Sequence, residues 1–123
     1  MGVIVSQKGD VGIAYVSKNR ETTWGVDLLK SLAKYLQEKN ISAVFVDNDL
    51  LLDGYKVAGV SKTLLNDVAF FALHISINVD LDLIKNICTK EMVKIPKGLN
   101  DYGITTEEIK IFIEEFEENN IKE

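Results

Sequence analysis

Two charged residues on a predicted hairpin, Asp49 and Lys56, are the side chains of this sequence whose spacing best suits joint chemistry. They flank Asp53-Gly54, a dipeptide that is typical of a two-residue turn with positive φ at both positions when it separates two apolar runs. Such a turn pairs Leu51 with Lys56 and Asp49 with Ala58, all on one face of the hairpin. Asp49 and Lys56 are then diagonal neighbours, with Cβ atoms about 7 Å apart. An ammonium group beside a small alanine and a glycine can hold an anion close to the backbone.

The elements that must position this pair follow from the periodicity of the apolar residues. Alternation predicts strands at residues 2–6, 11–17, 42–47 and 68–79, besides the two arms of the hairpin, the second of which reaches about Leu64. A helix is predicted from Thr22 or Thr23 to Asn40, and a short one begins at Asp80. Residues 97–103 are predicted to form a loop, and the capping box from Thr105 to Glu108 opens a final helix.

These elements predict an α+β fold with about six strands and three helices. Because most strands are joined by hairpins, the sheet is expected to be mixed and mostly antiparallel, with the helices packed on one side. A chain of 123 residues has the length of a single domain, so residues 1–123 are assigned to one domain.

Composition argues against several classes of function. The net charge is -5 and the 14 basic residues are scattered, which gives no basic patch for nucleic acid. No apolar run has the length of a membrane span, so no membrane association is expected. The one cysteine, Cys88, cannot form an internal disulfide, which favours a cytoplasmic location.

Two motifs resemble those of the biotin/lipoate-protein ligase family, and in particular its lipoate-protein ligase A-like cofactor transferases. The first runs from Asn48-Asp49 through Gly54 to Lys56 and Gly59. The second is His74 on a strand that leads into Asn78-Val79-Asp80-Leu81. The opening Gly2-Val3-Ile4-Val5 is similar to the end of the family's glycine-rich loop, and the last helix, with Phe116-Glu117-Glu118, is similar to its closing helix. The resemblance therefore spans nearly the whole chain.

The resemblance implies a fold like that of class II aminoacyl-tRNA synthetases and biotin synthetase, without its amino-terminal part. It implies a ligase that activates lipoate, octanoate or biotin with ATP and Mg²⁺ as an acyl adenylate and passes the acyl group to a carrier-protein lysine. Lys56 would be catalytic, because negative charge builds up where the carboxylate meets the α-phosphate. The residues implied to bind ligand are Gly2, Asn48, Asp49, Gly59, His74 and Asn78, and no resident metal site is implied.

The implied partners are a lipoyl or biotinyl carrier domain and either a second copy of the chain or a complementing chain.

The chain also departs from the family pattern at several positions. Ser6-Gln7 replaces the His-Asp of the loop, and Ile75 replaces the glycine after the histidine. Pro96-Lys97-Gly98 stands where octanoyltransferases have Pro-Cys-Gly, which fits the ligase branch and argues against a thioester intermediate.

Plainer interpretations stay open at each position. Lys56 could be a solvated lysine that protects an edge strand from aggregation, and His74 could be a core histidine bonded to a backbone carbonyl. Asn78 and Asp80 could end a strand and cap a helix. For the whole chain, the alternatives to an enzyme are a non-catalytic member of the fold that binds a cofactor, nucleotide or partner protein, and an unrelated small α/β protein.

Overall fold

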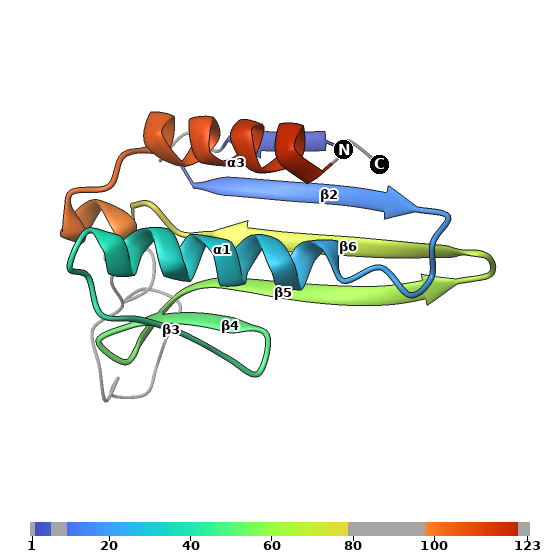
Figure 1. The fold of residues 1–123 in the computed structure, drawn as a ribbon, viewed down its shortest axis with the longest axis horizontal. Coiled ribbons are helices and arrows are strands. Elements are labelled where there is room, and N and C mark those ends of the chain that lie inside the picture. Colours follow the sequence, from blue (N-terminus) through green and yellow to red (C-terminus); the bar gives the residue numbers. More distant parts are fainter. Residues whose placement is uncertain (1, 6–9, 79–97, 121–123) are drawn as a thin grey trace, which may run out of the picture.

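A six-stranded antiparallel sheet forms the frame of the protein in the computed structural model, which describes residues 2–5, 10–78 and 98–120 (Figure 1). The strand order is β1-β2-β6-β5-β4-β3, and every neighbouring pair is antiparallel. The predicted α+β class is confirmed. The strands are β1 (Gly2–Val5), β2 (Val11–Ser17), β3 (Ala43–Val46), β4 (Asp49–Leu52), β5 (Tyr55–Leu65) and β6 (Val68–Ile75).

Two α-helices cover one face of this sheet. Figure 1 shows α1 (Trp24–Glu38) in front of β5 and β6, and α3 (Thr106–Asn120) toward β1 and β2. The buried core lies between these layers, and apolar burial is the main stabilising term. Its fully buried large side chains include Leu28, Leu29, Leu32 and Leu36 of α1, Leu50, Leu52, Phe71 and Ile75 of the sheet, and Ile109 and Ile113 of α3.

The helix α1 forms because apolar residues recur at helical spacing along the face that meets the sheet. The predicted end of this helix is confirmed, since Asn40 has a φ of 63° and the Ile41 N–H donates to the Leu36 carbonyl over 3.0 Å. Val26 lies at the border of this face and is only half-buried, whereas Leu28 is fully buried.

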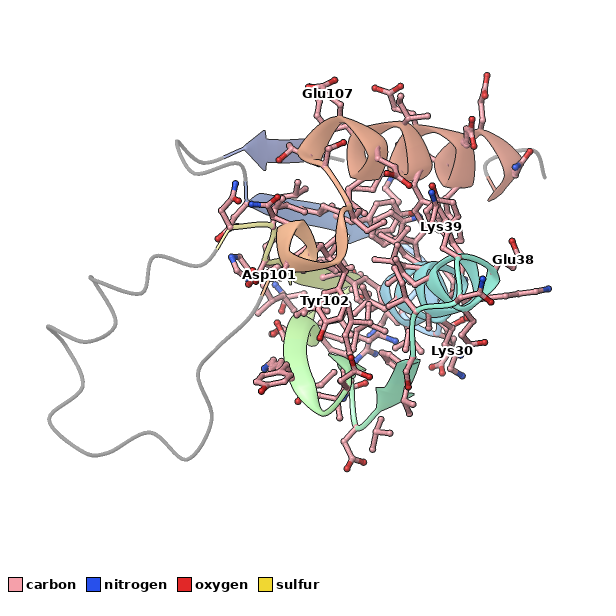
Figure 2. All side chains as sticks on the ribbon, turned by 90° about the vertical axis from the view of Figure 1, so that its left-hand side faces the viewer. Lys30, Glu38, Lys39, Asp101, Tyr102 and Glu107 are labelled. Atoms are coloured by element: carbon pink, nitrogen blue, oxygen red, sulfur yellow. The ribbon has the colours of Figure 1, made fainter. Side chains whose placement is uncertain are left out.

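The helix α3 is fastened to α1 by one acidic side chain. Half of the predicted capping box is present, because the Glu108 N–H donates to the Thr105 hydroxyl over 3.2 Å. The Glu108 carboxylate instead accepts a hydrogen bond from the Tyr35 hydroxyl and pairs with the Lys39 ammonium at 2.7 Å. Figure 2 shows Lys39 on the side of α1 that faces α3.

Tight turns with left-handed residues connect β3 to β6. Asp53 and Gly54 have φ values of 51° and 83°, which confirms the predicted turn between β4 and β5. Asp47 and Asn48 form a similar turn between β3 and β4, with φ values of 51° and 68°. Asn66, in the turn before β6, has a φ of 50°. Consecutive strands therefore become spatial neighbours.

Two sequence expectations need revision at the end of β6. The predicted strand 68–79 ends at Ile75, because the next residues turn to meet a short 3₁₀ helix, η1 (Leu99–Tyr102). Part of the predicted loop 97–103 forms η1, which is capped by Gly103 with a φ of 81°. The predicted helix from Asp80, Cys88 and the Ser6-Gln7 pair lie outside the described residues.

Within the part of the chain that the structure describes, neither α1 nor α3 covers the second face of the sheet, which is called the open face below. Side chains alternate along each strand, so this face carries the residues that do not meet the core. Several of them are exposed apolar side chains, namely Val16, Val44, Val46 and Leu65. The expected dimer stays a prediction. Among the helices of the described residues, none has the length and apolar character needed to span a membrane.

Candidate ligand-binding site

A depression of about 470 Å³ on the open face holds most of the predicted site residues. It lies over β4, β5 and β6, near the ends of these strands where the Asp53-Gly54 turn and η1 are found. Its polar lining consists of Asp49, Lys56, Ser61, His74 and Ser76. A volume of this size is within the range of pockets that hold small molecules.

A β-bulge in β5 decides which residues point into this depression. The register between β4 and β5 shifts after the first pairs, so that Lys56 still pairs with Leu51 but Asp49 pairs with Gly59. The predicted pairing of Asp49 with Ala58 is therefore wrong. One extra residue, Val57, is accommodated in β5 and reverses the alternation beyond it. Ala58 consequently turns into the core, where it is only 2% exposed.

The bulge brings three site residues together. Lys56 Nζ lies 3.1 Å from Asp49 Oδ1, which confirms that the two side chains share a face. A Cβ atom on Gly59 would stand 3.2 Å from Asp49 Oδ1 and 3.3 Å from Lys56 Nζ. The missing side chain of Gly59 thus leaves room directly beneath the ion pair, where a ligand could approach both the ammonium and the backbone.

The Lys56 ammonium remains accessible in spite of its partner. The Lys56 side chain is 61% exposed and that of Asp49 is 37% exposed, so the pair is well solvated. Exposed pairs of this kind contribute about 0–1 kcal/mol, and the ammonium can exchange its partner for a ligand anion at little cost. The edge-strand interpretation of Lys56 is wrong, because β5 lies between β4 and β6.

His74 lines the depression on the neighbouring strand. It pairs directly with Gly59, and its side chain is 63% exposed, so the core-histidine interpretation is also wrong. Its Nε2 atom lies 3.8 Å from Asp10 Oδ2, and its Nδ1 atom lies 3.5 Å from the Ser76 hydroxyl. The imidazole is therefore placed between a carboxylate and a hydroxyl group, with one edge open to the depression.

The carboxylate of Asp10 is fixed by the backbone at the end of β6. Its Oδ1 atom accepts hydrogen bonds from the Ile77 N–H at 2.7 Å and from the Asn78 N–H at 2.9 Å. This end of the strand is held in turn by η1, since the Leu99 N–H donates to the Ser76 carbonyl over 2.9 Å. Asp10 is consequently oriented by groups that belong to the framework of the fold.

Three of the predicted ligand-binding residues lie away from the depression. Asn48, in the turn after β3, lines a separate cavity beside α1, and its carbonyl accepts from the Val60 N–H at 3.0 Å. Asn78 follows β6 and accepts a hydrogen bond from the Asn100 side chain through Oδ1. Gly2 pairs with Ala14 on the edge strand β1. Asp49, Lys56, Gly59 and His74 are the predicted residues that the fold brings together.

Two residues of the site, Asp10 and Ser76, were not identified by sequence reasoning. Ser76 could have been found, because it follows His74 by two residues and so belongs to the same side of the extended chain. Asp10 reads as a turn residue in Lys8-Gly9-Asp10 and gives no sign of its contacts 67 and 68 positions further along the chain.

The donor set of the site suits an anion better than a resident metal ion. Among residues 2–5, 10–78 and 98–120, no cluster of three or more His, Cys, Asp or Glu side chains could hold a metal. Asp49 alone could share an ion such as Mg²⁺ with ligand phosphates, which is how Mg²⁺ is often bound. The ammonium over a bare glycine is the better-defined feature.

Comparison with solved structures finds the same fold in two kinds of cofactor ligase. LipL1 of P. falciparum in complex with lipoate matches with a TM-score of 0.65 and 21% identity, over 94% of this chain and 37% of that one. A lipoate-protein ligase A with bound ATP matches with a TM-score of 0.68 and 12% identity, over 92% and 52%. A variant of the Aquifex aeolicus biotin protein ligase in complex with biotin gives 0.66 and 20%, over 95% and 52%.

These matches establish the fold at low sequence identity. The chain spans 37–52% of the lengths of these three proteins. No protein-family model matches the sequence, and no curated protein matches it either.

Proposed function

We propose that the chain is a cofactor transferase of the lipoate- or biotin-protein ligase kind, which activates a carboxylic acid as an acyl adenylate and passes the acyl group to a lysine of a carrier protein. The proposal rests on one observation. The Lys56 ammonium lies in the depression of the open face, 3.3 Å from the point where a Cβ atom of Gly59 would stand. The fold shared with lipoate- and biotin-binding ligases supports it.

The chemistry of adenylation explains why this arrangement is useful. A carboxylate oxygen of the acid attacks the α-phosphorus of ATP, the bond to pyrophosphate breaks, and negative charge accumulates between the two anions. A cation fixed at that place stabilises the transition state more than the separated reactants. Lys56 is held on a strand and can supply this charge without a lid, while Gly59 lets the reacting groups lie against the backbone.

Asp49 has a second role in this proposal. It holds the Lys56 ammonium at 3.1 Å over Gly59, so the side chain is oriented before a ligand arrives. When ATP and the acid are bound, the ammonium turns to their oxygens and Asp49 is left to share Mg²⁺ or to accept from the ribose hydroxyls. A carrier domain then presents its lysine at the open face.

The decisive experiment is calorimetric titration of the chain with ATP, lipoate, octanoate and biotin, followed by exchange of labelled pyrophosphate into ATP in the presence of each acid. We expect exchange that depends on one of these acids and that is lost in Lys56→Ala. Thr63→Ala is the matched control, because Thr63 is an exposed residue of β5 outside the depression. Exchange that survives in Lys56→Ala would contradict the role of the lysine.

A second candidate is a non-catalytic protein of the same fold that binds the cofactor, a nucleotide or a partner protein. It is favoured by one finding, that Asn48 and Asn78, which the family resemblance assigned to ligand binding, lie away from the depression. The same titration separates the two candidates. Binding of an acid or of ATP without any pyrophosphate exchange is the result expected for the non-catalytic protein.

A further inference from the structure

His74 occupies a special place in the register of the sheet. Four strands that lie side by side in the sheet, β2, β6, β5 and β4, contribute one residue each to a row across the open face. This row is called the His74 row and consists of Gly12, His74, Gly59 and Asp49. His74 therefore has a glycine on both sides. Neighbouring strands are about 4.8 Å apart, and neither glycine has a side chain. Within this row, the space on each side of the imidazole is therefore about one strand spacing wide and holds no other side chain of the row.

The space on the Gly59 side connects the imidazole to the Lys56 ammonium. Directly opposed residues of antiparallel strands have Cβ positions about 5 Å apart. The Cβ atom of His74 is thus about 5 Å from the empty Cβ position of Gly59, and Lys56 Nζ is 3.3 Å from that same position. A small group placed over Gly59 would be within reach of both nitrogens. The site offers a cation on one side and a potential base on the other.

The neighbours of the imidazole favour one tautomer. Asp10 lies on the Nε2 side at 3.8 Å, and its carboxylate is held by the Ile77 and Asn78 N–H groups. A carboxylate on that side favours the form with the proton on Nε2, which leaves the lone pair on Nδ1. The Ser76 hydroxyl lies 3.5 Å from Nδ1 and marks the direction from which a polar hydrogen can approach. Such contacts are often long before the substrate is bound.

We propose that His74 is the general base of the transfer step, with Nδ1 taking a proton from the incoming lysine amine. This inference rests on the proposed function, because it requires an acyl adenylate over Gly59. Asp10 is a positioning residue, which orients the imidazole through its carboxylate at 3.8 Å. Among the described residues, the charged groups that face His74 are Asp10 beside β2, Lys56 on β5 and Asp49 on β4.

The proton balance of the step is simple. The acceptor lysine arrives as an ammonium and loses one proton to His74 Nδ1. The free amine forms the C–N bond to the acyl carbon, the C–O bond to the phosphate of AMP breaks, and AMP leaves with that electron pair. The second proton on nitrogen passes to water as the amide forms, and the imidazolium returns its own proton to solvent. Lys56 holds the departing phosphate.

The test compares two nucleophiles with chemically synthesised lipoyl-AMP as the acyl donor. One nucleophile is Nα-acetyl-lysine methylamide, whose amine is protonated near neutral pH, and the other is hydroxylamine, whose nitrogen is already neutral there. For His74→Gln we expect the rate with the lysine analogue to fall about 10²-fold, which is a typical contribution of general-base catalysis. The rate with hydroxylamine should change by less than about threefold, because no proton has to be removed before attack.

The pH profile provides a readout that a purely structural role would not change. Protonation of the amine lowers the rate with the lysine analogue in acid for both proteins. The wild-type rate should fall more steeply than that of His74→Gln, because acid also removes the base. Asp10→Asn keeps an oxygen for the Ile77 and Asn78 N–H groups but removes the charge. In this variant we expect a lower rate with the lysine analogue and little change with hydroxylamine, because the imidazole has lost the charged group beside it.

Each outcome decides one of two questions. Equal loss with both nucleophiles in His74→Gln, or no loss with either, would overturn the role of His74 as a base. A wild-type chain that does not accelerate aminolysis of lipoyl-AMP would overturn it as well. Acceleration without pyrophosphate exchange would support His74 but would contradict the adenylation step of the proposed function. Thr63→Ala again serves as the matched control on the open face, and thermal unfolding confirms that each variant is folded.

Discussion

Lys56 Nζ lies 3.3 Å from the point where a Cβ atom of Gly59 would stand, although the two residues are three positions apart on one strand. Residues at that spacing on a regular strand point to opposite faces. The ammonium and the bare backbone meet because of the bulge at Val57. The contact therefore belongs to the irregular part of the sheet, where bulges commonly redirect side chains at functional sites.

Gly59→Ala should separate binding from stability. The new methyl group would contact Asp49 Oδ1, Lys56 Cε and Lys56 Nζ, all of which are ends of flexible, solvated side chains that can move away. We expect the free energy of unfolding to stay the same or to rise by about 0.5 kcal/mol, because alanine restricts the unfolded chain. ATP should bind at least about tenfold more weakly, a loss of about 1.4 kcal/mol. Urea unfolding and calorimetry measure the two effects. A large loss of stability would contradict the structure at this position.

Gly98→Ala should have the opposite effect. A Cβ atom there would stand 2.4 Å from the Ile77 carbonyl oxygen, which is a backbone atom and cannot move without disturbing the end of β6. We expect the free energy of unfolding to fall by about 2 kcal/mol, as for other overpacked positions. The φ of Gly98 is -116°, so the cost comes from the contact alone. Urea unfolding beside Gly59→Ala tests this, and equal stability of the two variants would refute it.

Asp49→Asn distinguishes two roles of the carboxylate. If Asp49 mainly holds the Lys56 ammonium, removal of its charge frees that ammonium for other anions. We expect pyrophosphate alone to bind about threefold more tightly or better, by calorimetry at low salt, because screening weakens such exposed charges. Binding of ATP with Mg²⁺ should weaken, because the carboxylate that shares the ion is lost. Tighter binding in both titrations would show that Asp49 contributes nothing to the nucleotide.

The contact of Glu108 with Lys39 and Tyr35, which links α1 and α3, should make the free energy of unfolding depend on pH in the acid range. The Lys39 ammonium, and next the Tyr35 hydroxyl, lower the pKa of the Glu108 carboxyl below its ordinary value of 4.5. A lowered pKa in the folded state stabilises the fold above the unfolded pKa, and this stabilisation is lost as the pH falls through the folded pKa. Glu108→Gln should therefore lower the free energy of unfolding by about 1 kcal/mol at neutral pH, since the carboxylate makes charge-assisted hydrogen bonds but is partly exposed.

The difference between wild type and Glu108→Gln should shrink below about pH 4 in urea unfolding across pH. Glu114→Gln is the matched control, because Glu114 is exposed on the same helix. The pKa values of Tyr35, raised first by burial, and of Lys39, raised first by its bond to Glu108, imply a further loss of stability only in strong alkali. A difference that does not change with pH would contradict the link.

Local patterns were sufficient for most of the elements of this fold. The Asp53-Gly54 turn, the end of α1 at Asn40 and the half-formed cap at Thr105 each depend on residues within a few positions of one another. The sheet order could not be obtained in the same way. Nothing in the sequence of β2 says that its partner is β6, more than 50 residues away, because the open side of the hairpin β1–β2 could pair with any apolar strand.

The candidate site could be predicted only in part, because some of its contacts are local and others depend on the tertiary fold. Asp49 and Lys56 lie on one hairpin, so their proximity follows from the turn, whereas the pairing of Gly59 with His74 joins two strands whose register depends on the whole sheet. Asp10 was missed because its partners are brought to it only by the tertiary fold. The bulge was missed because both Val57 and Ala58 are apolar and either could have faced the core.

The bulge at Val57 also means that the strand carries two opposite phases, one before it and one after it. A regular strand that kept Val57 would have a single phase along its whole length. Either Lys56 would turn into the apolar layer, or every residue from Gly59 to Leu65 would exchange sides, with Ser61 and Thr63 driven against the helices and Val60 out into water. The bulge thus allows one strand to present Lys56 beside Gly59 and to keep Ala58 and Val60 on the side of the helices.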